Sequence, residues 1–268
     1  MSFDLCEELI RATKKGWLNE MERLLECGAD VNGQSEKDET PLLKACEGFD
    51  NIHIVRYLLD NGADVNHKRV AQIASSYYET ALSVCLEYSD VTTAQLLVDH
   101  GANVDEIVDE KSKTILLFVM EYVYSHIHND KGTLRSIEFL VKNGADVNAT
   151  DEQGCSPLSQ SVLAGNFDLV QLFVENGADL DSKDEDGDTA LDCACSNNDF
   201  KIATYLLHHG ATNTAKIDTS PIPEPTMEEK YLYLLYWFQK TDDDVKEAIL
   251  YQHLRSSLPD LVRGGSKK

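Results

Sequence analysis

The chain has 268 residues, and its 47 Asp and Glu residues against 24 Lys and Arg residues give a formal net charge of −23 at pH 7. An acidic surface of this kind repels nucleic acid phosphates and anionic lipids, so the composition argues against nucleic acid binding. It favours a soluble protein whose charged partners are basic.

The sequence also indicates where the protein works. No apolar stretch approaches the roughly 20 residues of a transmembrane helix, so we expect no membrane insertion. The first residues lack the positively charged segment of a signal peptide. Most of the seven cysteines fall in expected helices, where a thiol packs like Ala, which indicates reduced thiols. We therefore expect a cytoplasmic protein, with the nucleus as the alternative, that is monomeric on its own.

The first elements expected along the chain are a pair of short helices over residues 3–27. Leu5, Leu9 and Leu24 are spaced to face inward from this pair. No helix-capping sequence precedes it, which is typical of a terminal repeat because one of its faces meets water.

A five-residue phrase, Gly-Ala-Asp-Val-Asn in its first copy, then recurs with variations. Its copies begin at Gly28, Gly62, Gly101, Gly144, Gly177 and Gly210. The intervals between these glycines are 34, 39, 43, 33 and 33 residues. A period near 33 residues predicts similar units that bury their apolar faces against their neighbours and leave a long surface for partners.

Each unit is expected to contain two short helices. A Ser or Thr before the first helix, as in Thr40-Pro41 and Ser156-Pro157, can cap the free N–H groups, and Pro suits the first helical turn. The second helix carries an apolar run, such as residues 55–59 or 137–141. It ends at Gly, which adopts the left-handed C-cap conformation without a steric clash.

These motifs resemble the repeat of the ankyrin-repeat family. The best copies are Thr40-Pro41-Leu42-Leu43-Lys44-Ala45 and Ser156-Pro157-Leu158-Ser159-Gln160-Ser161. The resemblance implies an all-α solenoid of helix–turn–helix units over residues 1–214, with a short turn, here called a finger, before the first helix of each unit. The implied repeats are residues 2–34, 35–67, 68–107, 108–149, 150–182 and 183–214.

One departure from the family pattern concerns the His that normally braces the turn. It is replaced in every copy, by Leu43, Ser83, Leu117, Ser159 and Asp192. Repeats without this His are expected to be less stable than a consensus unit.

Two units are longer than the others, and the chain continues beyond the last repeat. Residues 67–79 predict a longer third finger, and residues 125–132 separate or prolong the helices of the fourth unit. Each insertion is either a tolerated surface loop or part of the binding face. Residues 215–268 predict a Pro-rich linker and a C-terminal helical pair that either caps the array or docks a second protein.

The sequence predicts no catalytic residue, cofactor or metal site. Cys193 and Cys195 are too close in a helix to share one face, and no Cys/His pair follows at the spacing of zinc ligands. Residues 184–188 resemble a calcium loop, but its twelfth position would be Cys193 in place of the bidentate Glu. Phosphate-binding and nucleophile-elbow sequences are absent. We therefore expect a protein that is not an enzyme.

The resemblance implies a protein–protein interaction scaffold. Ankyrin arrays meet their partners with the fingers and the exposed positions of the first helices, which line a concave groove. That register selects as partner-binding residues Tyr77, Glu79, Glu87, Tyr88, Glu121, Tyr122, Glu152, Gln153, Leu163, Glu185 and Asp186. Aromatic rings supply contact area and carboxylates select cations, so we expect a protein partner with a basic segment. The opposing interpretation is that these are ordinary solvated positions.

Further functions are compatible with the same sequence. The chain could be an adaptor whose C-terminal helices recruit a ligase or trafficking component, or a bacterial or viral effector that acts on a host protein in the host cytosol. Asn32, Asn66 and Asn148 resemble the asparagines that are hydroxylated in ankyrin proteins, and we treat them as candidate modification sites.

Overall fold

The computed structural model describes residues 5–48, 51–70, 77–124, 131–197 and 199–212. The chain divides into a unit of residues Met1–Ala215 and a unit of residues Lys216–Lys268. The second unit lies outside the described residues, as does the predicted linker and C-terminal helical pair. The fold described below is that of the first unit.

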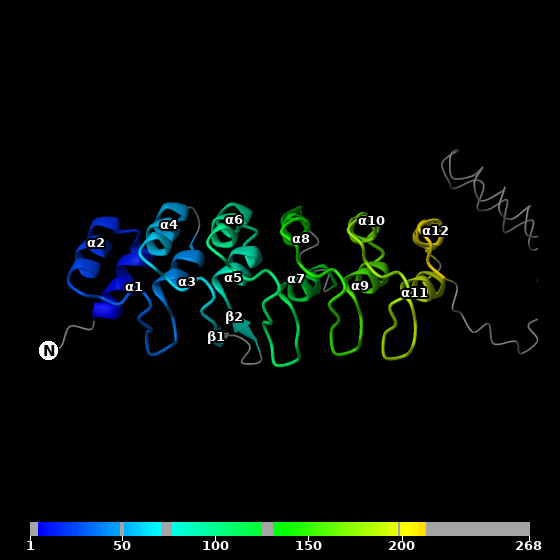
Figure 1. Ribbon diagram of the computed structural model, residues 1–268, viewed down its shortest axis with the longest axis horizontal. Helices are drawn as coiled ribbons and strands as arrows, with labels where there is room; N and C mark the ends of the chain where they lie inside the picture. Colours follow the sequence, from blue (N-terminus) through cyan, green and yellow to red (C-terminus); the bar gives the residue numbers. More distant parts are fainter. Residues whose placement is uncertain (1–4, 49–50, 71–76, 125–130, 198, 213–268) are drawn as a thin grey trace, which may run out of the picture. The chain divides into compact units, whose positions relative to one another are not determined.

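The described residues form six successive pairs of helices, as the repeat period predicts (Figure 1). The pairs are α1 Leu5–Lys15 and α2 Leu18–Glu26, α3 Pro41–Cys46 and α4 Ile52–Asp60, α5 Ala81–Glu87 and α6 Val91–Asp99, α7 Ile115–Tyr124 and α8 Lys131–Lys142, α9 Pro157–Leu163 and α10 Phe167–Glu175, and α11 Ala190–Ser196 and α12 Phe200–His208. The predicted all-α solenoid is confirmed.

The helices stack in two rows, with the fingers extending beyond the row of first helices (Figure 1). Each first helix packs against the first helix of the next unit, from α1 on α3 to α9 on α11. One apolar side chain recurs in each helix and is 3% exposed or less. These side chains are Leu9, Leu42, Leu82, Leu116, Leu158 and Leu191 in the first helices, and Leu24, Leu58, Leu97, Leu140, Phe173 and Leu206 in the second. Burial of each contributes about 1.5–3 kcal/mol to the free energy of unfolding.

The predicted capping residues begin the first helices. The hydroxyl of Thr40 accepts a hydrogen bond from the Leu43 backbone N–H at 3.2 Å, and Ser156 caps α9 in the same way. Thr80 and Thr189 form complete capping boxes with Ser83 and Asp192. Ser83 and Asp192, which replace the ankyrin His in their units, therefore accept hydrogen bonds from the backbone N–H groups of Thr80 and Thr189. These bonds compensate locally for the loss of the His.

The glycines of the recurring phrase end the second helices, as predicted. Their φ angles lie between 85° and 100°, in the region that disfavours side chains. At Gly144, for example, the Gly144 and Ala145 N–H groups donate to the Val141 and Leu140 carbonyls. The helix-end carbonyls are thereby satisfied where the chain turns into the next finger.

The third finger adds strand structure that the all-α prediction did not contain. Strands β1 Arg69–Val70 and β2 Tyr78–Glu79 pair antiparallel, with Arg69 opposite Glu79. The Tyr78 N–H also donates to the Val108 carbonyl of the fourth finger at 2.7 Å. The long insertion provides enough residues for a β-ladder, whereas the shorter fingers hold only turns and isolated bridges.

Candidate functional site

The fingers are bonded to one another along the array. Lys68 of the third finger pairs with Glu106 at 2.5 Å, and Lys111 of the fourth pairs with Glu152 of the fifth at 2.6 Å. The Glu185 N–H of the sixth finger donates to the Gln153 carbonyl of the fifth at 2.8 Å. These bonds join successive fingers and favour a defined finger row, although the exposed Lys111–Glu152 pair contributes little by itself.

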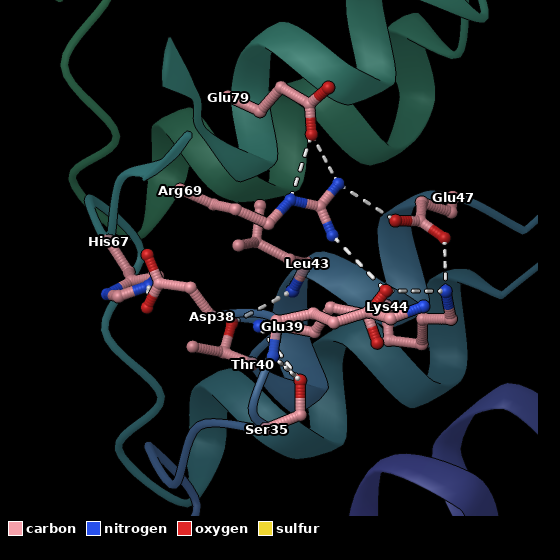
Figure 2. Close-up of polar contacts among 11 residues, drawn as sticks. Ser35, Asp38, Glu39, Thr40, Leu43, Lys44, Glu47, His67, Arg69 and Glu79 are labelled. Atoms are coloured by element: carbon pink, nitrogen blue, oxygen red, sulfur yellow. Dashed lines mark hydrogen bonds and ion pairs between the residues drawn. The ribbon is translucent and has the colours of Figure 1, made fainter. Parts of the chain in front are cut away.

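A buried arginine joins the third finger to the second unit (Figure 2). Arg69 lies on β1 and is only 4% exposed. Its Nη2 bonds to Glu47 Oε1 at 2.9 Å, and its Nε bonds to Glu79 Oε2 at 2.9 Å. Its Nη1 lies 3.7 Å from Glu39 Oε1. Lys44 pairs with Glu47 and Glu39 from the other side, at 2.7 and 3.3 Å.

We call these five residues, Glu39, Lys44, Glu47, Arg69 and Glu79, the Arg69 cluster. Burial favours the neutral form of Arg69 and lowers its pKa, but the hydrogen bonds that Arg69 donates to Glu79 and Glu47 outweigh burial and leave the pKa raised. The pKa of Lys44 is raised by the same balance, with Glu47 as its strongest partner. Both cations therefore remain charged, and the predicted partner residue Glu79 already has an internal cation.

A second internal cluster surrounds the predicted partner residue Tyr77. Its ring packs against Phe118 with centroids 5.4 Å apart, and Lys113 Nζ lies 5.5 Å from the ring centroid. Lys113 also pairs with Glu121, which the Tyr77 hydroxyl approaches at 3.4 Å. The pKa of Lys113 is lowered by burial but raised more strongly by Glu121. Tyr77 and Glu121 are thus engaged within the protein.

Other predicted partner residues are exposed. Tyr88, after α5, is 46% exposed, and Leu163, at the end of α9, is 37% exposed. The remaining exposed side chains are Glu87, Glu152, Gln153, Glu185 and Asp186. Tyr122 belongs to α7, but its side chain lies outside the described residues.

The acidic side chains differ in how far they are neutralised. Glu79 and Glu121 have cationic partners, and Glu152 pairs with Lys111. In the part of the array that the structure describes, Glu185 and Asp186 form no ion pair. Uncompensated negative charge therefore lies on the sixth finger, whereas the predicted central region is largely neutralised.

The candidate modification residues join neighbouring units. Asn32 donates from Nδ2 to the Gly62 carbonyl at 3.0 Å and accepts from the Asp64 N–H at 2.7 Å. Asn66 and Asn148 each make the equivalent pair of bonds to the unit that follows them. These exposed asparagines have a structural function, and their hydroxylation stays a prediction.

The cations of these two clusters that the sequence interpretation did not assign are Arg69 and Lys113. The insertion of residues 67–79 begins His67-Lys68-Arg69 and is about half polar, so nothing in the sequence indicated that Arg69 is the buried residue. The choice among the many carboxylates needed the fold. For Lys113, the segment Lys111-Ser112-Lys113, with two lysines around a serine, is common in exposed turns and indicated no specific partner.

The structure offers little chemistry beyond binding. Among the residues that it describes, no three His, Cys, Asp or Glu side chains are grouped to hold a metal ion, and no helix is long and apolar enough to cross a membrane. Burial raises the pKa of both the Cys155 and Cys193 thiols to about 11, and nearby aspartates add to this shift. Thiols with such high pKa values are poor nucleophiles at neutral pH.

Comparison with known proteins agrees with the architecture. The family model for ankyrin repeats, in three copies, matches residues 7–69 and 125–217, together more than half of the chain. The chain belongs to the ankyrin-repeat family. Proteins of this family are typically interaction modules without catalytic activity, and they generally mediate protein–protein interaction.

Relatives within the family come from diverse sources. An ankyrin-repeat protein of Acanthamoeba polyphaga mimivirus is 30% identical over 122 residues, which cover 44% of this chain and 71% of the viral protein. A fowlpox virus ankyrin-repeat protein is 27% identical over 60% of this chain, and the match spans 45% of its own length.

Solved structures extend the comparison. A complex of a predatory endopeptidase of Bdellovibrio bacteriovorus with an immunity protein contains a chain that is 29% identical, with a TM-score of 0.55, over 75% of this chain and 96% of that one. The ankyrin-repeat domain of Bcl-3 has a TM-score of 0.62 at 23% identity, over 76% of this chain and 86% of that one, and shows the same fold.

Proposed function

We propose that this ankyrin array is a non-catalytic scaffold that binds a basic segment of a protein partner with its fingers and the exposed ends of its first helices. The observation that carries the proposal is the row of cross-bonded fingers with uncompensated carboxylates on its sixth member. A pre-organised surface loses little conformational entropy on binding, and its unpaired carboxylates attract cations. Tyr88, after α5, and Leu163, at the end of α9, supply exposed apolar area on other units of the array.

The proposal shifts the expected contact along the array. Glu79 and Glu121 already have cationic partners, so a partner would have to displace them. We therefore assign the charge selection to Glu185 and Asp186, because Glu152 is also paired, with Lys111. Tyr88, Gln153 and Leu163 complete the proposed surface, with Glu87 at the end of α5. Tyr122 stays a predicted contact.

A second candidate is an inhibitor-type binder whose partner is an enzyme. Its support is the similarity to a chain from the complex of an endopeptidase with an immunity protein. Both candidates use the same surface, and they differ in whether binding blocks the partner's activity.

The test begins with affinity capture by the full chain and identification of the retained proteins by mass spectrometry. The purified partner is then titrated by calorimetry against wild type, Tyr88→Ala, Leu163→Ala and the double variant Glu185→Lys/Asp186→Lys. We expect each alanine variant to lose roughly 1–3 kcal/mol of binding free energy, because exposed apolar anchors dominate interfaces of this kind. The charge reversal should slow association and weaken its salt dependence.

The matched control is Glu138→Lys/Glu175→Lys, which makes the same charge change on exposed positions of the second helices α8 and α10. This control should bind like wild type. Equal loss of affinity in both charge-reversed variants would refute a specific role for the sixth finger, and normal binding by all finger variants would refute the surface.

A further inference from the structure

The Arg69 cluster gathers more charged groups than are needed to cap a helix or to form the turn of a finger. Three carboxylates, Glu39, Glu47 and Glu79, converge on one guanidinium from two different units, with side chains 16–27% exposed. Arg69 itself is 5% exposed at its side chain. A charge buried to this degree is tolerated only where its hydrogen bonds compensate for lost hydration.

The arrangement suits a planar guanidinium. Glu79 accepts from both Nε and Nη2, and Glu47 accepts a second bond from Nη2. A lysine ammonium could not donate to Glu79 and Glu47 from two separate nitrogens as Arg69 does, because its donors radiate from one nitrogen. The neighbouring Lys44 is itself bound to Glu39 and Glu47 by its ammonium, which shows that the same carboxylates accept two differently shaped cations.

One donor of the buried guanidinium is unsatisfied. Arg69 Nη1 is buried and has no hydrogen-bond acceptor among the described residues, although Glu39 Oε1 lies 3.7 Å away. The carboxylates therefore hold Arg69 by only part of its donor set. Because Nη1 lacks an acceptor, Arg69 is held less tightly than a fully bonded guanidinium, so a second guanidinium can compete with it for these carboxylates.

We propose that Glu39, Glu47 and Glu79 form a guanidinium-binding site that the chain fills with its own Arg69. In this state the third finger is latched to the second unit, and three carboxylates are withheld from basic partners. An arginine side chain of a partner is the ligand class that this site would take if Arg69 left it. The consequence for partner choice rests on the proposed function, whereas the existence of the site does not.

The experiment removes the internal ligand and supplies a substitute. Thermal unfolding of the full-length Arg69→Ala variant is followed by circular dichroism with millimolar guanidinium chloride, methylammonium chloride or sodium chloride at equal ionic strength. We expect Arg69→Ala to melt below wild type, and guanidinium to raise its Tm by about 3 °C more than sodium does. Methylammonium should have a smaller effect, because it lacks the planar fork.

Two matched variants make the result specific. Arg56→Ala removes the same charge from an exposed position on α4, and guanidinium should affect it no more than wild type. Arg69→Ala/Glu79→Gln lacks the carboxylate that contacts two guanidinium nitrogens, so at least half of the guanidinium effect should disappear. An equal Tm response to guanidinium and sodium, or an undiminished response in the double variant, would overturn the proposal.

If Arg69→Ala is unfolded without additives, recovery of its helical signal becomes the readout. Recovery with guanidinium but not with sodium supports the site, and recovery with both or with neither contradicts it.

Binding of a fluorescent oligoarginine peptide separates this proposal from the proposed function. Tighter binding of the peptide to Arg69→Ala than to wild type supports the proposal that Arg69 keeps the three carboxylates from basic partners. Failure of wild type to bind basic peptides weakens the proposed function and leaves the thermal result unchanged.

Discussion

At the scale of the residue, one side chain per unit decides how strongly successive units are joined. Asn32, Asn66 and Asn148 each donate to a glycine carbonyl and accept from a backbone N–H of the next unit. Asp105 and Asp181 occupy the same position but offer only an acceptor, to the N–H groups of Asp146 and Thr212. A carboxylate cannot donate, so these two junctions each lack one hydrogen bond.

We predict that Asp105→Asn raises the free energy of unfolding by about 1 kcal/mol. The new amide would donate to the Gly144 carbonyl as Asn66 donates to the Gly101 carbonyl at 3.0 Å. Urea unfolding monitored by circular dichroism measures the change. Glu138→Gln, which removes an exposed charge on α8 without adding an inter-unit bond, should change stability by less than half as much. If both variants shift the midpoint equally, lost charge repulsion explains the gain and the missing bond does not.

At the scale of the element, helix ends in most units depend on polar caps and on backbone with positive φ. Three second helices carry caps that the sequence interpretation did not assign, in which Asp90, Asn166 and Asp199 accept N–H groups of their first turns. A positive φ also occurs at Ser112, in the fourth finger, where the fifth and sixth fingers have Gly154 and Gly187. A serine in this region is strained in a way that glycine is not.

Opposite substitutions test this backbone requirement. Gly144→Ala should destabilise the array by about 1 kcal/mol because of its φ of 87° alone, since no atom lies within 4 Å of an added Cβ. Ser112→Gly should stabilise it by about 0.5 kcal/mol, after the added entropy of the unfolded chain is subtracted. Both effects are measured as midpoints of urea unfolding. A neutral Gly144→Ala would show that the C-cap conformation contributes nothing to stability.

At the scale of the whole molecule, the dominant electrostatic feature is the net charge of −23. The exposed ion pairs contribute little each, because water screens them. Mutual repulsion among the excess carboxylates opposes the compact state over distances of about 10–30 Å at low salt. We therefore expect long-range repulsion to outweigh the stabilisation from the surface ion pairs.

We predict that raising sodium chloride from about 0.01 M to about 0.1 M increases Tm, by roughly 3 °C, because the Debye length shrinks from about 30 Å to about 10 Å. Differential scanning calorimetry at constant pH measures the shift. Potassium chloride should act like sodium chloride, since screening does not depend on the cation's identity. A fall in Tm with added salt would mean that the ion pairs stabilise the folded state more than charge repulsion destabilises it.

The sequence by itself determined the repeat register, the helix pairs, the Thr and Ser caps, the left-handed glycines and the buried leucines. These features depend on residues that are close in the chain, so local conformational preferences and apolar periodicity suffice to predict them. The β-hairpin of the third finger escaped prediction because its ladder depends on pairing across the insertion.

Tertiary contacts, by contrast, were needed to show which acidic residues are already paired with cations of the protein. The sequence marked Glu79, Glu121 and Glu152 alike, but their cations Arg69, Lys113 and Lys111 lie 10, 8 and 41 residues away in the chain. The Lys111–Glu152 pair joins two units, whereas the other two pairs depend on how a finger folds within its own unit. Net charge and local pattern carry no information on such pairing, because Coulomb interactions depend on distance in space and on burial.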